Sequence, residues 1–248
     1  MSLAYSDTTN KDGIIQQIER TVGFDDGGIS DNSNLLKYFT GLVNQALDKV
    51  FAIIFDVGGT WQFDDSNHTK YPEITTDLVA SQRDYNFTTD QQGNLILDIY
   101  RVFVKYPSTA AGYNEIYPVD KQRDKGTQGL YDEVDTEGVP YYYDKTANGI
   151  FLDLIPEETV TLGLKILINR EGSYFVSTDT TKIPGFAGLF HEFLVLDPAY
   201  TWARNKSLPQ REALMRDRSV MEEKIRDHYS NRERDVRKRM VSKRILYK

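Results

Sequence analysis

Few residues of this chain stand in patterns that could do chemistry on a substrate. The sequence Asp56-Val57-Gly58-Gly59-Thr60 has the composition of a phosphate-binding glycine hairpin. Such a hairpin follows an early strand, whereas these residues end a long apolar segment of helical periodicity. We therefore interpret Gly58-Gly59 as a helix stop. The chain contains no Gly-x-x-x-x-Gly-Lys-Ser/Thr sequence, which excludes a P-loop.

The histidines do not form a metal-binding pattern. His68, His191 and His228 lack the paired spacing of metal ligands, and the pair His191-Glu192 lacks the second histidine of a zincin helix. We expect His191 to lie on a helix surface or at an interface. We predict no metal site and no cofactor.

Neighbouring carboxylates occur at three places in predicted turns. Asp64-Asp65, with Asn67 close by, offers oxygen ligands to Ca²⁺, but the EF-hand loop pattern is absent and we interpret the segment as a turn. Glu157-Glu158 and Asp25-Asp26 are adjacent in sequence, whereas a glycosidase pair must face each other across a cleft. We interpret both pairs as turn-solvating or helix-capping residues.

Nucleophile patterns are absent as well. The chain has no cysteine, which excludes disulfides, thiolate metal sites and a cysteine nucleophile, and it has no Gly-x-Ser-x-Gly elbow. Trp61 and Trp202 are interpreted as core or interface anchors, not ligand platforms. The sequence therefore predicts a protein that is not an enzyme.

Composition and length are those of a globular protein. The chain has 248 residues, of which 40% are hydrophobic and 27% charged, enough for one large domain or two small ones. Met1–Lys11 is polar and lacks the apolar core of a signal peptide, and the most apolar run, Val50–Val57, is too short to span a bilayer. We expect a soluble, intracellular protein without a membrane partner.

The N-terminal part predicts two helices. Asp12–Val22 carries apolar residues at helical spacing and is followed by Gly23, and Asp25–Asn34 reads as a linker. A second amphipathic helix is predicted over Asn34–Phe55.

From Thr60 to Phe175 the pattern changes to short β-rich runs separated by turn residues, and Thr127–Val139 reads as an exposed loop. Many short strands at close spacing predict an antiparallel sandwich or small barrel. The expected strands are Trp61–Phe63, Ile74–Val79, Tyr85–Phe87, Ile96–Lys105, Glu115–Val119, Val139–Tyr143, Ile150–Ile155 and Gly163–Asn169.

Helical periodicity returns after Pro184-Gly185. The segment Leu189–Trp202 is densely apolar and is expected to be buried on several sides, and a long charged helix is predicted from Pro209 to Arg239. Its apolar residues form a narrow seam: Leu214, Met221, Ile225, Tyr229, Val236 and Met240. We interpret this seam as the contact surface for a partner, because so polar a helix would gain little by burial in its own domain. Internal ion pairs such as Glu222 with Arg226 are the alternative explanation.

Charge is divided unevenly along the chain. Arg204–Lys248 holds fifteen basic and seven acidic residues, a net charge of +8, whereas residues 1–203 have a net charge of −15. A basic arm on an acidic body predicts contact with a complementary surface, on a neighbouring copy, a partner protein or nucleic acid.

A set of short sequence segments along the chain forms a recognisable pattern. The segments are Trp61–His68, Pro72–Val79, Gln82–Phe87, Ile99–Lys105, Pro118–Asp120, Gly138–Tyr143, Asn148–Leu152, Asp179–Phe186, Leu189–Glu192 and Ala199–Ala203. Together they resemble the head-to-tail connector, or neck adaptor, proteins of tailed bacteriophages, and the resemblance covers about residues 34–205 of this chain.

The resemblance implies a structural role. Such connectors form rings, commonly twelve-fold, beneath the portal protein and around the channel through which the genome passes. Helices build the ring wall, a β domain extends it, and a C-terminal segment docks on the portal. This predicts a virion neck or tail protein, assembled in the host cytoplasm, whose partners are copies of itself, the portal protein and other neck or tail proteins.

We accordingly predict an α+β fold with N-terminal helices, a central antiparallel β-sandwich or barrel-like domain, and C-terminal helices with a long basic arm. The expected parts are a helical connector core (1–59 and 184–208), a β-rich domain (60–183) and the arm (209–248). The predicted partner contacts are apolar at Leu214, Met221, Ile225, Tyr229 and Val236, and electrostatic at Arg232, Arg234, Arg237, Lys238 and Arg239.

Other functions stay open from the sequence. Lys238–Lys248 could contact genomic DNA, but only nonspecifically, because Tyr229 and Tyr247 are the only aromatic residues in the arm that could stack on bases. The chain could instead be a β-sandwich binding module of a phage tail component, or a small enzyme with an unrecognised carboxylate site.

Overall fold

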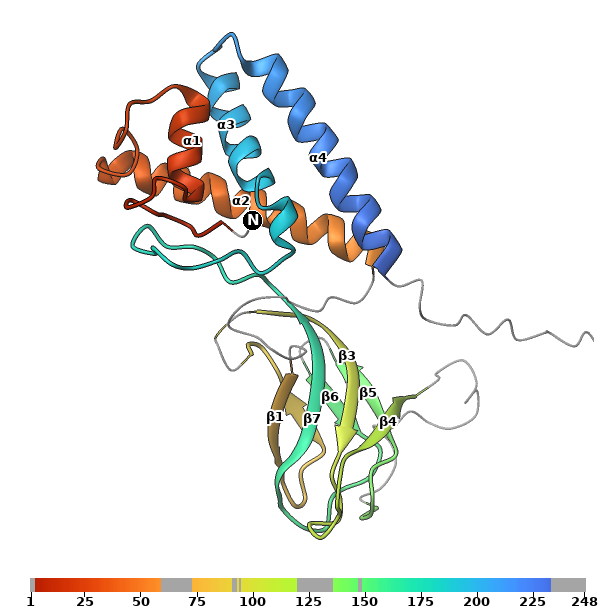
Figure 1. Cartoon of the computed structure of the whole chain (residues 1–248). Helices are drawn as coiled ribbons and strands as arrows, with labels where there is room; N and C mark the ends of the chain where they lie inside the picture. Colours follow the sequence, from red (N-terminus) through yellow and green to blue (C-terminus); the bar gives the residue numbers. More distant parts are fainter. Residues whose placement is uncertain are drawn as a thin grey trace, which may run out of the picture. The chain divides into compact units, whose positions relative to one another are not determined.

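The structure is a computed structural model of the chain, and it describes residues 3–58, 73–90, 93, 95–119, 136–146 and 149–232. The chain forms two compact units, one made of Met1–Trp61 with Tyr174–Lys248 and the other of Gln62–Ser173. The first is helical and the second is a sheet (Figure 1). The predicted α+β class is confirmed, and the sheet unit is inserted in sequence between the two halves of the helical unit.

The first helix, α1 (Ile14–Val22), forms because its isoleucines fall on one face. Ile14, Ile15 and Ile18 are fully buried. The helix ends at Gly23, whose φ of 86° lies in the left-handed region that glycine adopts without a steric penalty. The sequence-based range began two residues earlier, at Asp12.

The second helix, α2 (Ser33–Gly58), is longer at its end than predicted. Its start is capped by Asn32, whose Oδ1 accepts hydrogen bonds from the backbone N–H groups of Asn34 and Leu35. The loop before it is held by Glu19 of α1, a buried carboxylate that accepts the N–H groups of Ile29 and Ser30.

The C-terminal half supplies a 3-10 turn, η1 (Gly188–Phe190), and the helices α3 (Phe193–Asn205) and α4 (Arg211–Arg232). Among the described residues α3 is the central helix, and it packs against α1, α2 and α4 (Figure 1). Residues 193–199 are all buried, which confirms the prediction for this part of the apolar segment, whereas Leu189 is 74% exposed. No helix within the described residues is both long enough and apolar enough to cross a membrane.

Seven strands form one curled, mixed sheet in the described part of the second unit. Its order is β1-β7-β3-β4-β5-β6-β2. The strands are β1 (Glu73–Leu78), β2 (Asp84–Asn86), β3 (Ile96–Val104), β4 (Asn114–Pro118), β5 (Tyr142–Thr146), β6 (Gly149–Leu152) and β7 (Val160–Arg170).

The curled sheet is a half-barrel, which confirms the barrel-like alternative of the predicted β domain. It departs from the prediction in one respect, because β4 and β5 run parallel, with Tyr117 beside Tyr142. A parallel pair needs a longer connection than a hairpin, and more than twenty residues separate these two strands in sequence. In the short connection between the edge strands β1 and β2, the hydroxyl of Tyr85 accepts a hydrogen bond from the backbone N–H of Val79.

The inner face of the half-barrel is the core of this unit. It holds the fully buried Val102, Ile150, Leu152 and Ile166 among others. Burial raises the pKa of Tyr143, with smaller contributions from the negative charges of nearby carboxylates. Strands β1 to β4 lie within one residue of the sequence-based ranges, whereas β5 begins at Tyr142 and not at the predicted Val139. The predicted strand Trp61–Phe63 and most of the predicted loop Thr127–Val139 lie outside the described residues.

Candidate partner interface

The candidate site from sequence is the charged helix after Pro209, and the structure describes it as far as Arg232. The described helix α4 presents its seam to its own unit: Leu214, Met221, Ile225 and Tyr229 are all buried. These side chains pack onto a surface formed by α2 and α3. The expectation that this helix gains little by burial in its own domain is therefore wrong over Leu214–Tyr229.

The seam identified from the spacing is nevertheless the buried face. Residues between its members, such as Met215 and Val220, are more than half exposed. At the end of α4 the hydroxyl of Tyr229 accepts the backbone N–H of Ala187, and the Tyr229 ring lies against Phe190. The turn that precedes α3 is thus fixed to α4.

A buried carboxylate joins three helices. Asp197 of α3 has only 3% of its side chain exposed, and its oxygens lie 2.7 and 2.9 Å from Lys49 Nζ of α2. Arg218 Nε of α4 lies 2.7 Å from Asp197 Oδ1. Because a buried carboxylate is stable only when paired, this site fixes the position of α4 over α2 and α3.

The ion pairs continue along α4 towards its end. Glu222 lies between Arg218 and Arg226, at 3.8 and 3.9 Å, and Arg226 lies 3.1 Å from Asp56 of α2. The predicted Glu222–Arg226 pair is confirmed. These outer contacts are solvent-exposed and contribute little to stability.

The basic character of the predicted arm is not a property of α4. Arg211–Arg232 contains six basic and five acidic residues, a net charge of +1, whereas residues 233–248 contain seven basic and two acidic residues, a net charge of +5. The side chain of Arg232 and the whole of Arg234, Val236 and residues 237–239 lie outside the described residues. Their predicted partner contacts stay predictions.

His191 is not the surface or interface residue that was predicted. It is 1% exposed, its Nδ1 accepts the N–H of Leu3 at 3.0 Å, and its Nε2 lies 2.9 Å from Phe186 O. Burial lowers its pKa, because the charged imidazolium would lose its water. His228 lies on α4 with its ring 5.0 Å from that of Phe190, and His68 lies outside the described residues.

The other residues considered for chemistry in the sequence make structural contacts where the structure describes them. Glu158 accepts the N–H and the hydroxyl of Ser108, so it stabilises a loop. Asp26 lies 3.5 Å from Lys11 in an exposed ion pair. No group of three or more histidines and carboxylates among the described residues could hold a metal ion. Gly59-Thr60 and Asp64-Asp65 lie outside those residues.

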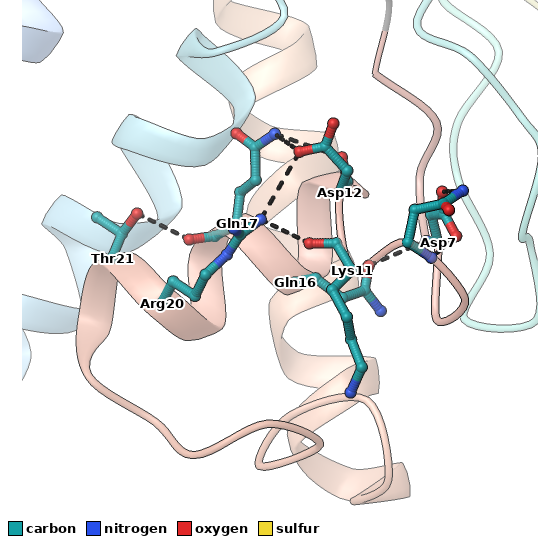
Figure 2. Close-up of polar contacts among 8 residues, drawn as sticks. Asp7, Lys11, Asp12, Gln16, Gln17, Arg20 and Thr21 are labelled. Atoms are coloured by element: carbon teal, nitrogen blue, oxygen red, sulfur yellow. Dashed lines mark hydrogen bonds and ion pairs between the residues drawn. The ribbon is translucent and has the colours of Figure 1, made fainter.

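A polar cluster surrounds the start of α1 (Figure 2). The amide of Gln17 donates to both the backbone and a carboxylate oxygen of Asp12, and Arg20 donates to the carbonyl of Lys11. Thr21 donates its hydroxyl to the carbonyl of Gln17. Each contact joins groups within one short stretch, so the cluster stabilises the helix start and does not resemble a catalytic arrangement.

Trp202 lies in an aromatic cluster on the helical unit. Its ring is 5.2 Å from Phe39, 5.7 Å from Phe24 and 5.8 Å from Tyr38. The prediction of an anchoring role fits these contacts, whereas Trp61 lies outside the described residues.

Sequence reasoning missed Asp197, the residue that fixes α4. A signal was present, because Asp197 is the one charge within the apolar run Phe193–Ala199. A lone carboxylate at a buried position requires a partner, and the basic residues of the following helix supply one.

Comparison with protein-family models and with curated proteins finds no match for this chain.

Proposed function

We propose that this chain is a structural subunit of a phage neck ring that joins the portal to the tail and surrounds the DNA channel. The likeness of its sequence phrases to head-to-tail connectors motivates the proposal. The helical unit would form the ring wall, with about twelve copies in a closed ring, and the sheet unit would extend from it.

The observation that carries the docking part of the proposal is the charge of residues 233–248. The body up to Arg232 has a net charge of −12, and the segment after it has a net charge of +5. Within α4, Arg218 and Arg226 already pair with carboxylates of the same unit. We therefore expect the positive charges of the segment beyond α4 to contact an acidic surface, either on the portal or on a neighbouring subunit.

Co-expression with the portal protein of the same phage tests this proposal. The full chain is expected to co-purify with portal rings, and a chain ending at Arg232 is expected to fold but not to join them. Charge reversal at residues 237–239 should have the same effect, whereas reversal at the exposed Arg216 and Lys224 of α4 should not. Failure of the full chain to join would overturn the function, and joining by the truncated chain would overturn the docking role.

A tail-component binding module is the second candidate, and one observation favours it. Tyr117, Tyr141 and Tyr142 of the sheet unit are 59%, 61% and 51% exposed, and tyrosine is enriched at protein interfaces. If the sheet unit binds a tail protein, changing Tyr117 and Tyr142 to serine should abolish that binding and leave portal joining unchanged. Loss of portal joining instead would contradict the separation of roles.

A further inference from the structure

The N-terminal segment Leu3–Ser6 is held in the helical unit by contacts from distant parts of the chain. Tyr5 donates its backbone N–H to Lys182 O at 2.8 Å, and Ser6 donates to Thr180 O at 3.2 Å. The Tyr5 ring is fully buried and stacks on Phe175 at 4.9 Å. The segment thus covers apolar surface of the helical unit.

One side chain holds the start of this segment. His191 Nδ1 accepts the N–H of Leu3, and Nε2 faces the carbonyl of Phe186. A carbonyl can only accept, so Nε2 carries the proton, and Nδ1 must then be unprotonated to accept from Leu3. Only this neutral tautomer satisfies both contacts.

Protonation of this ring would be costly because the ring is buried and both of its nitrogens already have hydrogen-bond partners. The Phe186 ring packs against it at 5.0 Å, and no Asp or Glu among the described residues forms an ion pair with it. On the side of α4, the Tyr229 hydroxyl accepts the N–H of Ala187, and the His228 ring lies against Phe190. Burial lowers the pKa of His191, and the hydrogen bond with Phe186 opposes this effect only in part.

We infer that His191 is an acid-sensitive lock on the N-terminal segment. Protonation at Nδ1 places an N–H group against the N–H of Leu3, so the ring must turn away or the segment must leave. Release of Leu3–Ser6 relieves this conflict and admits water to the imidazolium. The released segment would uncover the side chains around Tyr5 and Phe175, and the helical unit would expose apolar surface only under acid conditions.

Amide hydrogen exchange of the full chain, corrected for the intrinsic rate at each pH, tests the lock. Protection of the Leu3–Ser6 amides is expected to fall at least about fivefold between about pH 7.5 and about pH 5, while the amides of α2 keep theirs. The variant H191Q can accept and donate as the neutral ring does but cannot be protonated, so its protection should not depend on pH. The variant H228Q is the matched control and should behave as the unmodified chain.

Protection that stays constant in the unmodified chain, or that falls equally in H191Q, would overturn the inference. Should H191Q fail to fold, NMR titration of the unmodified chain decides the question. The midpoint of the His191 ring signal should coincide with the loss of Leu3–Ser6 protection. A His191 ring that titrates while the segment stays protected would also overturn the lock.

Discussion

Helix α4 and the segment that follows it form one basic arm in the sequence, yet they differ in net charge. Arg211–Arg232 is nearly neutral, and its seam is buried against α2 and α3. Residues 233–248 carry a net charge of +5. The charge total over Arg204–Lys248 hides this difference, because it adds a helix whose basic and acidic residues nearly balance to a segment with few acidic residues.

The comparison shows that helical periodicity can identify the buried face of a helix but not the surface that covers that face. A spacing of seven, four and four residues identifies the face of a helix that is buried, and it did so here for Leu214–Tyr229. It does not identify the surface that covers that face. The helical unit supplies the cover through α2 and α3, so the partner proposal now depends on the residues beyond Arg232.

The largest expected effect is a difference in stability between two truncated chains, one without residues 209–248 and one without residues 233–248. Deleting residues 209–248 removes four buried seam side chains, each contributing about 1.5–3 kcal/mol, which together approach the whole stability of a domain. The shortened chain should not fold its helical unit, as measured by thermal unfolding. Deleting only residues 233–248 should leave the melting temperature nearly unchanged. Equal stability of both truncated chains would contradict the assignment of α4 to the body.

The next largest effect on stability is expected at Asp197, the buried carboxylate of α3 that pairs with Arg218 of α4. Asp197→Asn removes the charge that pairs Lys49 and Arg218, and breaking such a pair costs about 3 kcal/mol because the remaining cations lose their partner. Chemical denaturation of the full chain measures this loss. A cost below about 1 kcal/mol would mean that Asp197 does not hold α4 in place.

A single seam residue gives a comparable test of packing. Ile225 is fully buried, so Ile225→Ala should lower the free energy of unfolding by about 2–4 kcal/mol. Val220 on the same helix is half exposed, and Val220→Ala should change it by less than about 0.5 kcal/mol. Similar effects at the two positions would indicate that the seam is not the packed face.

The smallest effect is expected at the outer ion pair. Asp56 and Arg226 lie 3.1 Å apart, but both side chains are largely solvated. Asp56→Asn should therefore cost less than about 0.5 kcal/mol in denaturation measurements at moderate salt, in contrast to Asp197→Asn. A cost as large as that of Asp197→Asn would show that the outer pair, and not the buried one, secures the helix.

Much of the fold follows from sequence, because most elements obey local periodicity. The isoleucines of α1 and the alternation in β3 indicated their elements within a few residues. The parallel pairing of β4 with β5 could not be predicted, because strand direction depends on how the long connection runs and not on the pattern within either strand. The sequence left a sandwich and a barrel-like sheet as alternatives, since alternation is the same in both, and the half-barrel decides between them.

The candidate site was predictable only in part. The seam residues were identified, but the pairing of Arg218 with Asp197 joins residues twenty-one positions apart on different helices. The buried state of His191 was missed because a histidine beside Glu192 suggests a solvated helix start. Its bond to Leu3 spans 188 positions, and no local pattern carries that information.

Cryo-electron microscopy of the phage particle that contains this protein would test the central claim most directly. We expect a closed ring of this chain beneath the portal, with α4 packed on α2 and α3 of its own subunit and residues 233–248 against the portal or a neighbouring subunit. A particle whose neck lacks this chain, or a ring in which residues 233–248 touch only their own subunit, would contradict the account.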